Sequence, residues 1–122
     1  MLKFVMLILA LTSLYGATEI KKIYHDNGNI ELEESYENGL KNGISKSYFE
    51  NGKLEAIMSY TDGKRDGVTK SYYENGQLES VVIYNNGKRN GLAQSFYEDG
   101  RVESEVMFKN GTPLGSVKRY AR

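Results

Sequence analysis

Few residues of this chain have side chains suited to chemistry. His25 is the only histidine among the 122 residues, and cysteine is absent. Without a thiol, the chain can form no disulfide, thiolate zinc site or cysteine nucleophile, and a single histidine gives a Ser–His pair little support. His25 stands at a position that Phe49, Tyr73 and Tyr97 fill later in the chain at equal spacing, so we interpret it as a substituted aromatic residue. We therefore predict that the chain is not an enzyme and binds no cofactor.

The acidic residues offer only weak metal-site patterns. Glu31 and Glu33 would share one face of a strand and could form a weak cation site, but a solvated face is the simpler interpretation. Residues 62–67 resemble the start of a calcium loop, although the remaining carboxylates are missing at the required spacing. Asn110, Gly111 and Thr112 match a glycosylation acceptor, yet Asn or Asp precedes Gly here in every repeat. We interpret both segments as turns and predict no metal site.

The spacing of the glycines predicts the turns, and the turns determine where the strands and their side chains lie. Twelve of the 13 glycines fall into three series of constant spacing, as in Gly28, Gly52, Gly76 and Gly100. Asn-Gly and Asp-Gly between apolar runs are strong hairpin signals, because both residues tolerate positive φ. In the third copy we predict a tight turn at Asn75-Gly76 and a longer turn over residues 86–91. The predicted structural turn glycines are Gly28, Gly39, Gly43, Gly52, Gly63, Gly67, Gly76, Gly87, Gly91, Gly100, Gly111 and Gly115.

The segments between turns are rich in Tyr, Val, Ile and Ser and have the length of strands. We predict an all-β fold, a single-layer antiparallel meander of about nine strands. It is built from four 24-residue β-hairpin repeats, at about 24–47, 48–71, 72–95 and 96–119, with a partial strand at 20–23. Alternation places Leu78, Ser80, Val82 and Tyr84 on one face. The pattern leaves open which aromatic of each pair, such as Tyr72 and Tyr73, shares that face.

The aromatic residues keep the same register as the glycines and would form rows across the sheet. Tyrosine offers rigid contact area and a hydroxyl group, and it is enriched at binding surfaces. The alternative is that these rows only stabilise the sheet through cross-strand packing. The predicted interaction surface consists of Tyr48, Tyr60, Tyr72, Tyr73, Tyr84, Phe96 and Tyr97.

The balance of charged residues indicates which classes of partner the chain is suited to bind. The chain has 16 basic and 16 acidic residues, so no overall field attracts nucleic acid, and membrane contact is not indicated either. We expect a protein partner of unknown identity. Basic residues gather near both expected sheet edges, where they would guard against strand pairing or form a docking site for an acidic partner. Edge-to-edge oligomers remain an alternative. The basic edge residues are Lys21, Lys22, Lys118, Arg119 and Arg122.

Residues 1–16 differ from the rest. Lys3 precedes an unbroken apolar run over residues 4–11, and a more polar stretch ends at Gly16. This order is typical of a secretory signal peptide, and the run is too short to span a bilayer, which needs about 20 residues. We predict cleavage after Gly16, a mature domain over 17–122, and a periplasmic or secreted location. The alternative is a buried N-terminal strand or short helix.

The repeat resembles the MORN-repeat variant of bacterial proteins. The motif is Tyr-x-(Glu/Asp)-(Asn/Asp)-Gly-(Lys/Gln/Arg)-(Leu/Val)-Glu, then Tyr-x-(Asn/Asp)-Gly-Lys-Arg-(Asn/Asp)-Gly. Residues 48–67 and 72–91 match it well, and 24–43 and 96–115 more loosely. The resemblance implies a β-hairpin repeat fold. Together with the leader and the tyrosine-lined sheet, it leads us to predict an exported, non-enzymatic protein-interaction or scaffold module. It also implies two alternatives: an antitoxin or immunity protein of the YwqK type that binds a cognate toxin, and a peripheral lipid-binding module.

Overall fold

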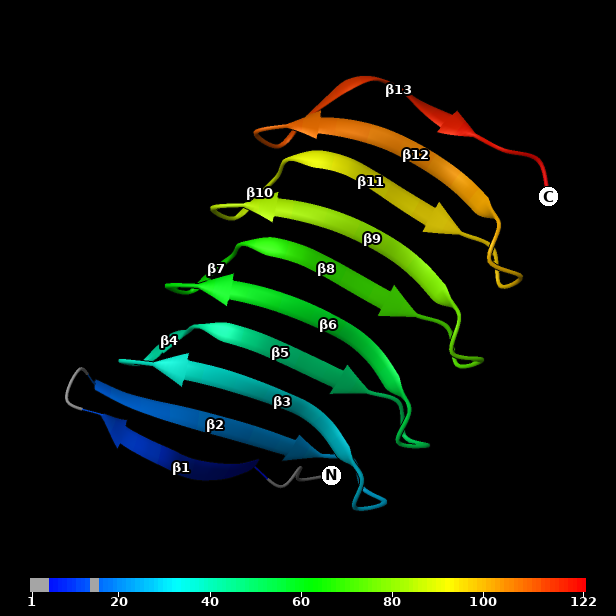
Figure 1. Ribbon diagram of the computed structural model, residues 1–122. Coiled ribbons are helices and arrows are strands. Elements are labelled where there is room, and N and C mark those ends of the chain that lie inside the picture. The colour runs from blue at the N-terminus through cyan, green and yellow to red at the C-terminus, as the bar shows by residue number, and fades with distance from the viewer. Residues whose placement is uncertain (1–4, 14–15) are drawn as a thin grey trace.

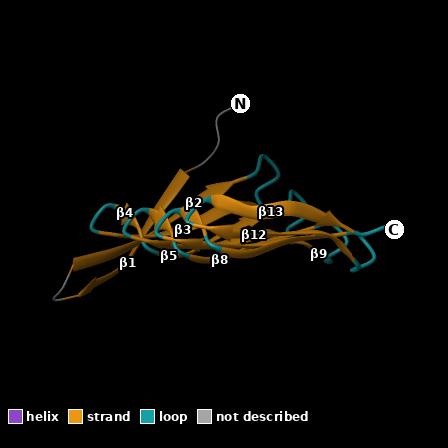
Figure 2. Ribbon diagram, turned by 90° about the horizontal axis from the view of Figure 1, so that it is seen from above, coloured by secondary structure: helices purple, strands orange, loops and turns teal. Residues whose placement is uncertain are grey.

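The computed structural model describes residues 5–13 and 16–122, with side chains from residue 18 onward. This part of the chain forms one antiparallel sheet, which Figures 1 and 2 show as a single layer without helices. The sheet has 13 strands, in the order β1-β2-β3-β5-β6-β8-β9-β11-β12-β13, and the two-residue strands β4, β7 and β10 pair with β3, β6 and β9. The predicted all-β meander is therefore confirmed.

Each repeat contributes one long strand and one short strand. The long strands are β3 (Ile30–Glu37), β6 (Leu54–Thr61), β9 (Leu78–Asn85) and β12 (Val102–Lys109). The short strands are β5 (Gly43–Tyr48), β8 (Gly67–Tyr72) and β11 (Gly91–Phe96), and the edge strand β13 spans Thr112–Arg119. The two-residue strands are β4 (Leu40–Lys41), β7 (Lys64–Arg65) and β10 (Lys88–Arg89). At the N-terminal side lie β1 (Val5–Ser13) and β2 (Gly16–Tyr24). Because β2 pairs with both β1 and β3, Lys21 and Lys22 do not lie at a sheet edge, and that expectation is wrong.

The tight turns lie where the sequence predicted the longer ones. Asn86 and Gly87 have φ of 51° and 86°, and the next two residues, Lys88 and Arg89, already pair with Asn85 and Tyr84. Positive φ at both central residues is typical of a two-residue type I′ hairpin turn, which Asn-Gly favours. The predicted six-residue turn is thus a two-residue turn followed by a short strand.

The other series of turns uses Asn differently. Tyr73 N donates to Gln77 O, and Gly76 N donates to Tyr73 O, which defines a three-residue loop closed by a glycine with φ of 88°. Asn75 does not have positive φ; instead its Oδ1 accepts a hydrogen bond from Gln77 N at 2.9 Å. Asn is therefore favoured here because its side chain closes the loop.

A break separates each two-residue strand from the short strand that follows. In the third repeat Asn90 N donates to Ile83 O, and Gly91 has φ of 116°. A Cβ atom at Gly91 would lie 3.1 Å from Cδ1 of Ile83. Glycine is needed here for both its conformation and its lack of a side chain.

The N-terminal hairpin follows the repeat only in part. Strand β1 pairs antiparallel with β2, and its register shifts between Leu9 and Leu11. The positions equivalent to Asn42 and Gly43 are Thr18 and Glu19. Without that glycine, we infer, β2 cannot form the break of the later repeats, and the irregularity lies on β1 instead. Residues 1–4, 14 and 15 of the predicted leader lie outside the described residues, and cleavage after Gly16 stays a prediction.

A single-layer sheet leaves the chain without a conventional core. No hydrophobic side chain among the described residues is buried, and the two buried residues are Glu34 and Ser45, at 5% and 2% exposure. The sheet must therefore be stabilised by backbone pairing and by side-chain rows that run from one repeat to the next.

Candidate binding surface

The register divides the side chains between two faces. Ser71 pairs with Ser80, Thr69 with Val82, and Gly67 with Tyr84. Because side chains alternate along a strand, these residues share one face, which we call face one. Val68 pairs with Ile83 and therefore belongs to the opposite face, which we call face two.

Face one carries a row of aromatic rings covered by cations. The Lys41 ammonium lies 5.0 Å from the centre of the Tyr60 ring, and the Arg65 and Arg89 guanidinium groups lie 5.2 and 5.3 Å from the rings of Tyr84 and Phe108. Arg65 also donates to the Tyr84 hydroxyl at 3.0 Å. Each cation comes from one repeat and each ring from the next, so the row connects repeats.

The first repeat buries a carboxylate in this row. Lys41 Nζ lies 2.7 Å from Oε1 of Glu34, and the Tyr36 hydroxyl donates to Oε2 at 2.7 Å. Burial alone would raise the pKa of Glu34, but its bonds to Lys41 and Tyr36 hold that pKa below its ordinary value. Burial and the adjacent carboxylate raise the pKa of Tyr36 to about 12. Both partners of the carboxylate therefore favour its charged form.

A second set of side chains ties repeats together at the other end of the strands. The hydroxyls of Tyr73 and Tyr97 donate to the carbonyls of Phe96 and Tyr120, at 2.6 and 2.8 Å. The equivalent residue His25 bonds the Tyr48 carbonyl through Nε2 at 2.7 Å. Because a carbonyl only accepts, Nε2 carries the hydrogen. His25 thus takes the structural place of a tyrosine.

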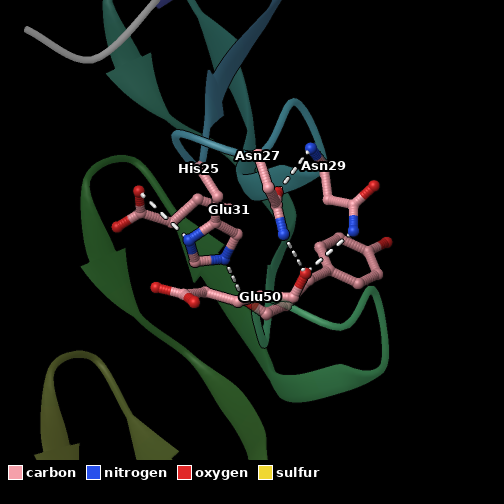
Figure 3. A network of polar contacts seen from close by, with 6 residues as sticks. His25, Asn27, Asn29, Glu31 and Glu50 are labelled. Atoms are coloured by element: carbon pink, nitrogen blue, oxygen red, sulfur yellow. Dashed lines mark hydrogen bonds and ion pairs between the residues drawn. The ribbon is translucent and has the colours of Figure 1, made fainter.

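Polar neighbours complete this contact, as Figure 3 shows. Nδ1 of His25 lies 3.8 Å from Oε2 of Glu31, and Asn27 and Asn29 both donate to the Glu50 carbonyl, at 2.7 and 2.8 Å. An open depression of about 610 Å³ lies beside them. In the described part of the chain, no group of three or more acidic, His or Cys side chains is arranged to hold a metal ion. The depression is lined by His25, Glu31, Tyr48, Phe49, Glu50, Asn51, Glu55 and Glu74.

Face two exposes apolar side chains in a continuous row over five neighbouring strands. Val68 pairs with Ile83, and Leu92 pairs with Met107, which in turn pairs with Leu114. Strands β9 and β11 pair at Val81 with Gln94, and the same register continued by two residues places Leu92 opposite Ile83. Val68, Met107 and Leu114 are 42%, 44% and 54% exposed. We call these five residues the apolar row.

Lysines border the apolar row on both sides. Lys70 pairs with Val81 and Lys118 pairs with Glu105. Val81 and Glu105 are two residues from Ile83 and Met107 along their strands, so both lysines lie on face two. Toward the tight turns, Lys88 pairs with Asn85, and Lys109 follows two residues after Met107. All four lysines are exposed. The row is therefore an apolar strip whose margins carry four lysines, with one carboxylate, Glu105, beside Lys118.

The seven residues predicted as one interaction surface do not share a face. Tyr60 and Tyr84 lie in the aromatic row of face one, in contact with Lys41 and Arg65. By alternation Tyr48, Tyr72 and Phe96 lie on face two, where they pair with Leu54, Leu78 and Val102. The expectation that Leu78 shares a face with Ser80 is therefore wrong, because the bulge at Glu79 separates the two. Tyr73 and Tyr97 reach the backbone of the next repeat. Whether any of them binds a partner stays a prediction.

The apolar row was not predicted as a site. The long strands carry an extra residue at Glu79 and its equivalents, because Ser71 pairs with Ser80 but Tyr72 pairs with Leu78. This bulge interrupts strict alternation, and the breaks at Asn90-Gly91 change the register again. The sequence nevertheless carried a signal for the apolar row: Ile44, Val68 and Leu92 occupy equivalent positions of three repeats. At solvent-facing positions, soluble proteins more often have polar side chains.

Comparison with known proteins agrees with this geometry. The MORN repeat variant family matches residues 20–38, 41–62, 65–86 and 89–110, so the last three matches keep the constant spacing of the glycines. No curated protein matches the chain.

Solved structures also match this chain, and one of these matches covers most of it. A crystal structure of a mutant of S. aureus TarM, in complex with Fondaparinux, alpha-GlcNAc-glycerol and UDP, matches with a TM-score of 0.50 and 14% identity. The match covers 88% of this chain but 21% of the TarM chain, so this chain spans about a fifth of that protein. At this identity the likeness concerns the fold alone.

Proposed function

Because the chain belongs to the MORN repeat variant family, we propose that it is an exported, non-enzymatic protein-binding or scaffold module that docks its partner on face two. MORN repeats form modules involved in binding. The observation that supports face two is its exposed apolar row, in which Val68, Met107 and Leu114 remain 42–54% exposed. Contiguous apolar surface on a soluble protein is typical of an interaction site.

The other surfaces support structural roles. On face one the rings of Tyr60 and Tyr84 are covered by cations of the preceding repeat, so their contact area is already used. Tyr73 and Tyr97 have their hydroxyls bonded to backbone carbonyls. Tyr48, Tyr72 and Phe96 extend face two toward the three-residue turns and enlarge the proposed docking area.

We also propose that the protein catalyses no reaction. A general base must be free to reach a substrate proton. Nε2 of His25 is instead bonded to the Tyr48 carbonyl. Export rests on the leader-like residues 1–16, and N-terminal sequencing of the mature protein tests it: a start at Ala17 is expected, and retained Met1 would contradict export. No helix in the part of the chain that the structure describes is long and apolar enough to cross a membrane.

A capture experiment with a matched pair of variants tests the docking face. The full chain, a Met107→Glu/Leu114→Ser variant and a Val117→Ser variant are used to capture proteins from the cell envelope fraction. Val117 is 45% exposed, yet it lies on face one because its neighbour Lys118 pairs with Glu105 on face two. A partner retained by the full chain and by Val117→Ser, and lost from the double variant, is the expected result. Equal capture by all three would contradict docking on face two.

The same capture separates the hypotheses about the partner. An antitoxin or immunity protein would retain a toxin, whereas a scaffold would retain an envelope protein without toxic activity. Mass spectrometry of the retained protein, followed by its expression with and without this chain, distinguishes the two.

A further inference from the structure

The dimensions of the apolar row restrict what can cover it. Its five residues lie on the neighbouring strands β8, β9, β11, β12 and β13. Four inter-strand spacings of about 4.8 Å give a strip about 19 Å long. Along the strands its neighbours on face two are Lys70, Gln94 and Glu105, with one apolar neighbour, Val81, beside Ile83, so the strip is one to two side chains wide. A strip of these proportions matches the apolar stripe of one helix, which needs about 13 residues at about 1.5 Å per residue.

The charge at the margins is positive. Lys70 and Lys118 lie along one side, and Lys88 and Lys109 lie along the other, all of them exposed. The Lys118 ammonium also lies 5.1 Å from the centre of the Tyr120 ring, which leaves Lys70, Lys88 and Lys109 as the main positive charges. The strand carboxylate that borders the row, Glu105, is already engaged. It accepts hydrogen bonds from the Tyr120 hydroxyl and from Nε2 of Gln94, which lies 2.8 Å away. The margins therefore complement acidic side chains on both sides of an apolar stripe.

Two other occupants fit these observations less well. A second copy of this chain, docked through the same face, would bring lysine margins against lysine margins, and like charges at an interface are unfavourable. A membrane surface would meet a narrow strip inside a sheet, whereas interfacial anchors usually present Trp, Phe or Leu on a protruding element. The described residues of face two include no Trp.

We infer that the apolar row and its lysine margins bind an amphipathic helix of a partner protein whose apolar stripe is flanked by Asp and Glu. The helix lies across the strands, with its apolar side chains against Val68, Ile83, Leu92, Met107 and Leu114. Its carboxylates face Lys70 and Lys118 on one side and Lys88 and Lys109 on the other. This inference rests on the proposed function, since it specifies the partner of the same face.

A pair of synthetic helical peptides tests the inference. Each is a helix of about 14 residues, long enough to cover the apolar row. Both carry the same leucine stripe, and one has Glu and the other Lys at the flanking positions. Binding of the fluorescein-labelled peptides to the full chain is followed by fluorescence anisotropy at two salt concentrations. The Glu peptide is expected to bind at least about tenfold more tightly than the Lys peptide and to weaken as salt rises.

Variants of the chain locate the binding. Met107→Glu/Leu114→Ser is expected to weaken binding of the Glu peptide by at least about tenfold, because it removes apolar contact and adds a repelling charge. Val117→Ser, on the same edge strand but on face one, is expected to bind as the unchanged chain does. A circular dichroism spectrum of each variant checks that the sheet is intact. A second double variant, Lys70→Gln/Lys88→Gln, keeps the apolar row and tests the charge contribution alone.

Every other outcome overturns the inference. Equal binding of the two peptides, or binding unaffected by the face-two variants, excludes the proposed helix. Sedimentation with anionic phospholipid vesicles that depends on the apolar row would assign the face to a lipid surface. A concentration-dependent dimer that the double variant abolishes would assign it to a second copy. If envelope capture depends on the row while neither peptide binds, the proposed function stands and this inference fails.

Discussion

At the scale of single residues, equivalent positions of the four repeats act as natural substitutions of one another. His25, Phe49, Tyr73 and Tyr97 occupy one such position. The side chains of three of them form a hydrogen bond with a backbone carbonyl of the next repeat. The side chain of Phe49 has no polar atom and cannot form this bond. The consequence is that the contact between the second and third repeats lacks a hydrogen bond that the other contacts have.

Phe49→Tyr is therefore expected to stabilise the protein. The new hydroxyl would reach the Tyr72 carbonyl as Tyr73 reaches that of Phe96, and such a bond contributes about 0.5–1.5 kcal/mol. Urea unfolding followed by circular dichroism measures the change in free energy of unfolding. Tyr73→Phe is the matched control and should destabilise by a similar amount. Loss of stability in Phe49→Tyr would contradict the assigned role of this position.

Buried hydroxyls give a second prediction. Ser45 Oγ and Thr69 Oγ1 are buried without a hydrogen-bond partner, and the equivalent later residues are Ala93 and Val117. Thr69→Val keeps the shape and removes the unpaired group, so it should raise the free energy of unfolding by about 1 kcal/mol. Ser71→Ala is the control and should lower it, because Ser71 Oγ bonds Ser80 Oγ at 2.6 Å. Equal effects of the two substitutions would contradict this account.

The buried Glu34 predicts a dependence of stability on pH. Its pKa is depressed in the folded protein, so its contribution is present above the unfolded carboxyl pKa of about 4.3 and is lost as pH falls through the lower folded value. Glu34→Met places in the first repeat the residue that the second has at Met58. Unfolding in urea at neutral pH and near pH 3 should show a smaller acid loss in this variant. Parallel losses in both proteins would show that Glu34 does not contribute.

At the scale of the elements, the sequence predicted the meander but not the details of its turns. Glycine spacing and Asn-Gly pairs indicate hairpins without telling which pair closes the tight turn, since Asn86 acts through its positive φ and Asn75 through its side chain. Strand alternation fails at bulges, because one extra residue such as Glu79 changes the face of what precedes it. The faces, and with them the apolar row, depend on these local irregularities and were not predictable from the pattern.

The breaks between strands also connect successive turns. Asn90 Oδ1 accepts a hydrogen bond at 3.0 Å from the backbone N of Asn110, in the next tight turn, and Asp66 does the same for Asn86 at 3.2 Å. Asn90→Ala is expected to lower the free energy of unfolding by about 1 kcal/mol. Leu114 stands at the equivalent position of the fourth repeat, with no later tight turn among the described residues. Leu114→Ala should therefore change stability less, and an equal loss in both would contradict this role of the break.

At the scale of the whole molecule, the sheet is one layer thick. With no hydrophobic side chain buried among the described residues, face two keeps its apolar row available for a partner. Face one is occupied by contacts between repeats, such as Arg65 with Tyr84 and Lys41 with Glu34. We therefore propose that the two faces differ in role: most side-chain contacts between repeats lie on face one, and face two binds the partner.

Site-specific photo-cross-linking in the producing cell can show which face of the sheet contacts a partner. A benzophenone amino acid replaces Met107 on face two or Val117 on face one, both exposed and on neighbouring strands. Irradiation followed by immunoblotting reports any covalent adduct with a partner protein. We expect a discrete adduct of higher mass from position 107 and none from position 117. An adduct from position 117 alone, or none from position 107, would contradict the assignment of face two as the binding face.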